Sequence, residues 1–335
     1  MAVGTGVDST MVVLANTINA FVQKAIEPVI FDQVLKHNPV LYRFWRKGPV
    51  LDGGASLIWP VLSNTKQYGG WYTGAGQLPH GVEDTIQPAE VLWKHVAEDV
   101  TIPRTDIIKA RTPYAKVNLI KTKFDEALLT LRARISQALL DTAASPGNAG
   151  LALDSLPQAI DDGGVTSSYA GISHTATNSA GAYFWKPGLN NDGVLSTSTP
   201  ATMTVLQDYY GRASDGDVQP TLCITTQAGF NYVWGQMQAL QRFTQDDEMT
   251  KVGFENFKFN RAVVVVDRNL AAGSWLNVNE EWVDLVSHEE ENFGVDPIIP
   301  GSPSERSINT KVVWSGNIRV KAIRYNSKII NASNF

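Results

Sequence analysis

The longest run of a single hydrophobic period lies in residues 112–145. Apolar side chains recur there at steps of three and four: Val117, Ile120, Phe124, Leu128, Leu131, Ile135 and Ala138. That spacing places them in one stripe along an α-helix. Thr112 suits the N-cap and Pro113 the first helical position, while Pro146 and Gly147 would end the helix. The pattern predicts one helix over 113–145, roughly 30 residues and about 45 Å long.

Residues 52–103 have a different pattern. Two strand-like runs, 56–62 and 91–102, enclose a polar segment rich in glycine. This arrangement predicts a long β-hairpin that projects from the body of the protein. The glycines do not indicate a phosphate loop, because the Lys-Ser/Thr pair is missing. A lone hairpin is only marginally stable, so we expect a neighbouring copy of the chain to cover it.

The remaining sequence mixes short helices and strands. Helices are predicted at 153–160, 202–212 and 227–243, and strands at 220–226, 257–268 and twice within 274–288. In the tail, 311–330, the apolar residues Ile318, Val320 and Ala322 alternate with Arg319 and Lys321, as in a half-solvated antiparallel strand. We expect the tail strands to return and cover the stripe of the long helix, which gives an α+β fold.

The first 50 residues read as an arm with two amphipathic pieces, Met11–Ile26 and Val29–Arg46. The second piece ends in basic residues interleaved with Tyr42, Phe44 and Trp45. Such a run can stack on nucleic acid, or it can anchor the arm on a neighbouring subunit or on the chain's own core. We favour the anchor, because the run is short and isolated.

Composition favours large covered surfaces. Charged residues make up 18% of the 335 positions, and there are nine Trp. Because an average soluble domain has about 25% charged residues, much of the surface is expected to face partner chains. The net charge of −5 argues against a dedicated nucleic-acid binder, although it leaves nucleic acid as a neighbour open.

The sequence holds no recognisable catalytic motif. The single cysteine, Cys223, lies in an apolar run and excludes internal disulfides and multi-cysteine metal sites. The histidines lack metal-ligand spacing: they are His37, His80, His95, His174 and His288. Nucleophile-elbow, phosphate-loop and dinucleotide-binding motifs are missing, as is any run of about 18 apolar residues. We therefore predict no catalytic, cofactor-binding or metal site, no enzyme activity and no membrane span.

The order of the elements resembles the major capsid (head) proteins of tailed double-stranded-DNA bacteriophages. Four stretches carry this resemblance: 153–188, 222–243, 254–270 and 274–293. It implies a capsid fold with an N-terminal arm (1–50), an extended loop (51–103), a peripheral domain and an axial domain. The peripheral domain would hold 104–145 and 311–335, with 257–268 also considered for it, and the axial domain would hold 146–256 and 269–310.

The resemblance also implies a function. Copies would assemble into hexamers and pentamers of an icosahedral head around double-stranded DNA, in the host bacterial cytoplasm, and the protein would reside in the virion. Partners would be further copies, a portal protein and, where a phage has them, decoration proteins, without a membrane or a cofactor. Some family members carry a long N-terminal scaffold, whereas this arm begins almost at Met1. That difference implies a separate scaffolding protein or numbering after processing.

Candidate interface residues follow from charge. Lys116, Lys121 and Lys123 fall in the N-terminal half of the long helix, where the helix dipole disfavours cations. We expect carboxylates from a neighbour's hairpin to lie there. The expected interface residues are Lys121, Lys123, Glu83, Asp84 and Glu90, together with Trp71 and Tyr72 at the hairpin tip and Trp45 in the arm.

Two other functions remain open at this point. An encapsulin-type nanocompartment shell uses the same fold to hold a cargo enzyme, although the long two-part arm favours a phage head. From a different class, a β-rich carbohydrate-binding domain would use aromatic loops: Trp71, Tyr72, Tyr183 and Trp185. The material that co-purifies with the chain separates the first two, and a monomer with sugar affinity would indicate the third.

Overall fold

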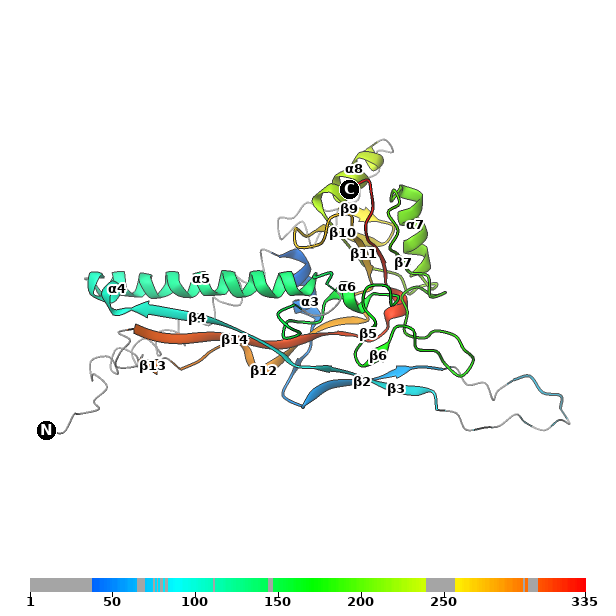
Figure 1. Cartoon of the computed structure of the whole chain (residues 1–335), viewed down its shortest axis with the longest axis horizontal. Coiled ribbons are helices and arrows are strands. Elements are labelled where there is room, and N and C mark those ends of the chain that lie inside the picture. Colours follow the sequence, from blue (N-terminus) through cyan, green and yellow to red (C-terminus); the bar gives the residue numbers. More distant parts are fainter. Residues whose placement is uncertain are drawn as a thin grey trace.

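The computed structural model describes residues 38–64, 70–74, 76, 78, 81, 84–110, 112–143, 147–238, 257–297, 299–300 and 307–335. Figure 1 shows an elongated lobe in which one long helix lies along a sheet, a second lobe standing above one end of it, and a projecting hairpin. The prediction for Met11–Ile26, most of the predicted Val29–Arg46 piece and the residue Glu83 lie outside the described residues.

The long helix is α5, Pro113–Leu139, which begins where the sequence predicts. Thr112 caps it, since its side chain accepts a hydrogen bond from Ala115 N at 3.2 Å. The predicted stripe faces the core: its five central residues, Ile120, Phe124, Leu128, Leu131 and Ile135, are buried. The two ends of the stripe, Val117 and Ala138, are half-buried.

The helix ends before the predicted boundary of residue 145. Beyond Leu139 the backbone carbonyls bond elsewhere: Ser155 Oγ donates to Asp141 O at 2.5 Å, and Gln158 Nε2 donates to Ala143 O at 3.0 Å. Both donors belong to the capping box of the short helix α6, Leu156–Ala159. Tertiary hydrogen bonds therefore end α5 early.

The first sheet lies under α5. Its strands are β1 (Val50–Leu51), β4 (Lys94–Pro103), β12 (Val283–Val295), β13 (Ile299–Pro300) and β14 (Ser307–Val320). The order is β1-β12-β14-β13, and β4 pairs with the other edge of β14. Alternate residues of β4 and β14 point toward the core, among them Ile102, Ile308 and Val312. The tail strand β14 thus lies in the same lobe as α5, where the tail was expected to return.

The second sheet forms the upper lobe in Figure 1. Its order is β7-β15-β11-β8-β10-β9. The strands are β7 (Val194–Leu195), β8 (Leu222–Thr225), β9 (Phe257–Phe259), β10 (Ala262–Val266), β11 (Trp275–Val278) and β15 (Ser327–Ile329). Helices α7 (Met203–Arg212) and α8 (Gln227–Gln238) belong to this lobe. Its core is rich in rings, such as Phe259 against Trp275 at 5.7 Å between centroids.

The division between the sheets corrects three sequence expectations. Residues 257–268 form not one strand but a hairpin, with Asn260 at φ 53° in its turn, and it belongs to the second sheet. β12, within 269–310, pairs with β14 in the first sheet. The tail contributes to both sheets, because β14 lies in the first sheet and β15 pairs with β11 of the second. Pairing between strands that are far apart in sequence thus sets the sheets, and contiguous sequence ranges do not.

The projecting hairpin is β2 (Ser56–Leu62) paired with β3 (Ile86–Leu92). The predicted second strand, 91–102, is extended as predicted except at Trp93, which separates β3 from β4; only its first two residues belong to the hairpin. Trp93 Nε1 donates to Gly54 O at 2.8 Å. After this break β4 leaves the hairpin and runs antiparallel to β14, with Lys94 opposite Gly316 and Pro103 opposite Ser307.

The remaining elements are short. They are α3 (Pro39–Lys47), α4 (Arg104–Lys109), the small hairpin β5 (Ser168–Tyr169) and β6 (Ile172–Ser173), and a 3₁₀ turn, Ile323–Tyr325. Asn38 caps α3 by accepting from Leu41 N at 3.0 Å. Arg43 of α3 donates two hydrogen bonds to the carboxylate of Glu280, from Nε to Oε1 at 2.7 Å and from Nη2 to Oε2 at 3.0 Å. This bidentate pair holds α3 against the loop that follows β11.

Candidate assembly surfaces

The inner face of the β2–β3 hairpin is part of the core. Leu57 and Trp59 of β2 are buried and lie opposite Val91 and Ala89 of β3. The backbone of the hairpin is also attached to the body, because Glu90 N donates to Ala170 O at 3.0 Å. The base of the hairpin is thereby fixed relative to the lobes.

The outer face of the hairpin is apolar as well. Four large aliphatic side chains there are exposed: Ile58 by 62%, Leu62 by 65%, Ile86 by 55% and Leu92 by 61%. Leu62 lies directly opposite Ile86, so their side chains form one patch. Contiguous exposed apolar surface marks an interaction site. These four residues were not among the interface residues expected from the sequence, although the run SLIWPVL lacks the polar alternation of a half-solvated strand.

The hairpin tip carries exposed aromatic rings. Trp71 is 106% exposed and Tyr72 60% exposed, as expected for interface candidates. At the root of the tip, exposed Asp84 accepts a weak hydrogen bond from Ile86 N at 3.4 Å. Glu90 is exposed in the middle of the apolar outer face, opposite Ile58.

The far end of the elongated lobe is basic and partly apolar. Ile108 of α4 is 67% exposed and Tyr114 of α5 is 77% exposed. Lys121 is exposed and makes no ion pair within the part of the chain that the structure describes. Lys123 differs, because Glu126 of the same helix lies 3.1 Å away; its carboxylate partner is thus already present in the same chain.

The hairpin and the basic end do not meet within one chain. Figure 1 shows α4 at one extreme of the molecule and the hairpin extending from the other. A contact between Lys121 and Asp84 or Glu90 therefore needs a second copy.

Trp45 is not an interface residue. It is 8% exposed and packs in the chain's own core, with its ring 4.9 Å from Phe293 and 6.0 Å from Trp314, between centroids. Of the two destinations open for the aromatic anchor, the core is the one observed. Phe293 reaches this cluster with φ 58°, in a stretch of β12 where the register against β14 shifts.

One surface cluster has the composition of a catalytic triad but not its geometry. His95 Nδ1 lies 2.5 Å from Ser315 Oγ and 3.2 Å from Glu291 Oε2. A proton relay needs the serine on one ring nitrogen and the carboxylate on the other, whereas here both contact Nδ1. Among the described ranges, no group of three or more His, Cys, Asp or Glu side chains could hold a metal ion.

The aromatic loops do not form the sugar platform that the carbohydrate alternative requires. Trp185 is 1% exposed, and its Nε1 donates to Tyr169 O at 3.1 Å. The ring of Tyr183 is covered by Lys186, whose Nζ lies 4.0 Å from the ring centroid. Only Trp71 and Tyr72, of the four residues proposed, present open ring faces.

His174 and Cys223 are buried and have polar partners within the chain. His174 is fully buried, and its Nδ1 and Nε2 contact Trp185 O at 3.1 Å and Gln158 O at 3.2 Å; burial lowers its pKa. Cys223 is buried as predicted, burial raises the pKa of its thiol, and its Sγ contacts Asn277 Oδ1 at 3.1 Å. These groups fit a structural role.

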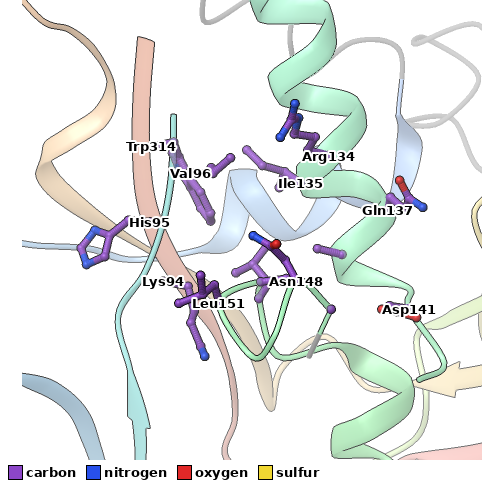
Figure 2. Close-up of a pocket in the computed structure, with 14 residues that line it drawn as sticks. Lys94, His95, Val96, Arg134, Ile135, Gln137, Asp141, Asn148, Leu151 and Trp314 are labelled. Atoms are coloured by element: carbon purple, nitrogen blue, oxygen red, sulfur yellow. The ribbon is translucent and has the colours of Figure 1, made fainter. Parts of the chain in front are cut away.

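A cavity lies between the end of α5, the start of β4 and the loop 147–153. Its volume is about 470 Å³, and its walls include Ile135, Leu151 and Trp314. Figure 2 shows the side chain of Asn148 pointing into its centre and Arg134 above it, whereas His95 points to the opposite side of β4. Arg134 is ion-paired with Glu98 of β4. The cavity is a second candidate contact surface, again unforeseen from the sequence.

Comparison with solved structures identifies the fold. A chain from the cyanophage A-1(L) capsid asymmetric unit matches with a TM-score of 0.65 at 14% identity, over 88% of this chain and 93% of that one. The fold is that of a phage capsid subunit. A chain from the capsid of a native GTA particle gives 0.53 at 10% identity, over 87% and 90%. The holo-SrpI encapsulin complex of Synechococcus elongatus PCC 7942 gives 0.54 at 11% identity, over 87% of each chain.

These matches confirm the predicted α+β capsid fold. No protein-family model and no curated protein sequence matches the chain. Of the helices in the described ranges, none combines the length and the hydropathy needed to cross a bilayer.

Proposed function

We propose that this chain is the structural subunit of a phage head, whose copies form hexamers and pentamers of an icosahedral shell around double-stranded DNA. The observation that carries the proposal is the hairpin, which projects from a capsid fold with apolar side chains on both faces. A contiguous exposed apolar surface of this kind marks a site that another chain covers.

The contact we propose is head to tail. The hairpin of one copy, with Asp84 and Glu90, lies on the basic end of the next copy, with Lys121 and the exposed side chains of Ile108 and Tyr114. Apolar patches meet, and opposite charges face one another. Because the two surfaces differ, repetition of the contact closes a ring when the rotation allows it. Rings of six and five subunits are the units of the proposed shell.

The proposal also includes partners other than further copies of the chain. A separate scaffolding protein and a portal protein would act during assembly in the host bacterial cytoplasm, and decoration proteins would bind the finished virion. The protein would have no catalytic role. Double-stranded DNA would be enclosed by proximity, in keeping with the net charge of −5.

A nanocompartment shell is the second candidate, supported by the similarity to the encapsulin complex. The contents of purified particles separate the two. A phage-head subunit produced with its neighbouring gene products yields particles with DNA and a portal, whereas a nanocompartment yields particles with a single enzyme. Particles filled with one enzyme and free of DNA would overturn the phage-head proposal in favour of the second candidate.

Charge reversal tests the contact. The Lys121→Glu/Lys123→Glu variant is expected to remain folded but to lose rings and shells, and Asp84→Lys/Glu90→Lys in the same chain is expected to restore them. Because Lys123 already pairs with Glu126, Lys121→Glu alone should give most of the loss. Asp217→Lys, a reversal in the second lobe, serves as control. Unchanged assembly of the Lys121→Glu/Lys123→Glu variant would contradict the proposed contact.

A further inference from the structure

The cavity at the end of α5 has the chemistry of a receptor for one aromatic side chain. Ile135, Leu151 and Trp314 give it apolar walls, and its volume of about 470 Å³ lies within the usual range of ligand pockets. Asn148, in the centre of Figure 2, is exposed, and its side-chain amide has no hydrogen-bond partner among the residues described. The side chain of Arg134 also lines the cavity.

An indole matches each of these features. Its ring provides a large apolar surface, and its N–H needs a single acceptor when buried, which the Asn148 amide oxygen supplies. Arginine stacks on the indole face more favourably than on other rings. An aliphatic side chain would leave the amide unpartnered. An acidic one would face the apolar walls, and the two cations that line the cavity already have partners: Arg134 pairs with Glu98, and Lys94 donates to Gly150 O at 2.5 Å.

In the described part of the chain, one tryptophan is fully exposed and could supply this indole. Trp71 at the hairpin tip is 106% exposed, whereas Trp45, Trp59, Trp185, Trp275 and Trp314 are buried. A fully exposed tryptophan has no contacts that could stabilise it in its own chain. Its own cavity is out of reach, because the hairpin extends away from α5 (Figure 1).

The proposed head-to-tail contact brings the two together. Arg134 follows Lys121 by thirteen residues on α5, which is about 20 Å along the helix. Trp71 follows Asn64 by seven residues, a span of at most about 25 Å. A hairpin that places Asp84 over Lys121 and runs toward the end of α5 therefore reaches the cavity.

We infer that Trp71 of one copy inserts into the cavity formed by Ile135, Asn148, Leu151 and Trp314 of the next copy. This inference rests on the proposed shell function and deepens it, since it names the receptor site for the hairpin tip. Trp71 then acts as the anchor of the contact, in the manner of buried tryptophans at other interfaces.

Cross-linking of assembled particles tests the inference. Cys223 is fully buried, so it stays unreactive while two cysteines are introduced at Thr73, beside Trp71, and at Ala149, which is exposed next to Asn148 and is not part of the cavity wall. A short bismaleimide is expected to link the Thr73→Cys/Ala149→Cys chains into dimers and longer ladders. Adding Trp71→Ala should lower the yield about tenfold, the effect of an anchor residue, while Tyr72→Ala should lower it less.

A matched pair tests the direction of the hairpin. In Thr73→Cys/Asn118→Cys the second cysteine sits at an exposed position in the N-terminal half of α5, and no ladder is expected. Rings or shells without the Ala149 ladder would overturn the inference and leave the proposed function standing, as would a ladder from the Asn118 pair. A chain that remains monomeric would overturn both.

Discussion

Lys328 Nζ lies 2.5 Å from Asp161 Oδ1, and neither side chain is more than 3% exposed. Lys328 belongs to β15 of the second sheet, while Asp161 follows α6 beneath it. Lys328 also donates to Pro157 O at 2.9 Å, and the other carboxylate oxygen of Asp161 accepts from Thr166 N at 2.6 Å. A fully buried ion pair with these additional hydrogen bonds ties the two lobes together.

Removal of one partner of this pair should lower the stability of the protein strongly. Lys328→Met leaves Asp161 as an uncompensated buried charge, so we expect a loss of about 3–5 kcal/mol in the free energy of unfolding. The double variant Lys328→Met/Asp161→Asn should lose less than the sum of the two single changes. Urea denaturation measures both. A loss below about 1 kcal/mol for Lys328→Met would mean that the pair is not buried as described.

Acid should weaken the attachment of α3. Glu280 is buried, which raises the pKa of its carboxyl, but Arg43, Lys47 and Thr221 outweigh burial and hold the pKa below its ordinary value. The unfolded chain therefore binds the proton first, and the stabilisation is present above the unfolded value of about 4.3 and lost as pH falls through the folded one.

The comparison with Glu280→Gln measures this effect. At neutral pH the variant should be less stable than the wild type, and the difference should shrink as the pH falls below about 4, because protonated glutamate resembles glutamine. Urea unfolding at a series of pH values gives the two curves. A difference that stays constant down to pH of about 2 would contradict the assigned role of Glu280.

Gly48 has no room for a side chain. It lies between α3 and β1, and a Cβ there would stand 1.9 Å from the carbonyl oxygen of Leu285 in β12. Gly48→Ala must push the backbone of α3 away from the first sheet, so we expect a loss of about 2–3 kcal/mol in the free energy of unfolding. Gly53→Ala is the control, since nothing lies within 4 Å of its added Cβ. Equal stability of the two variants would refute the close approach of Gly48 to the carbonyl oxygen of Leu285.

The outer face of the hairpin should matter for assembly and not for folding. Leu62 is 65% exposed, so Leu62→Lys should change the free energy of unfolding by no more than about 0.5 kcal/mol. In the proposed contact the same change buries a charge and should abolish rings and shells. Val165→Lys, an exposed loop position, is the matched control. Circular dichroism and analytical ultracentrifugation give the two readouts, and normal shells from Leu62→Lys would exclude this face from the contact.

Elements with complete local signals were predictable from sequence. Thr112 and Pro113 mark the start of α5, and its stripe has the helical period throughout, so its existence and buried face followed directly. β8 is buried at every position, as predicted from the strand-forming run around Leu222, Cys223 and Ile224. In such segments capping, period and burial all favour the same structure.

Elements whose boundaries depend on partners far away in the sequence could not be predicted. Residues 94–103 read as a strand, but nothing local indicates that β14, some 200 residues later, would separate them from the hairpin. The left-handed Asn260 turns an apparently continuous strand into a hairpin. The receptor cavity combines β4, α5, the loop 147–153 and β14, and no local pattern could bring those four segments together.

The most direct test of the account is the size of the purified chain in solution, alone and with the proposed scaffolding protein. Sedimentation velocity with negative-stain images should find rings or closed shells built from the 335-residue subunit. A single monomeric species under both conditions, with an intact fold by circular dichroism, would contradict the claim that the exposed hairpin exists to bind a second copy.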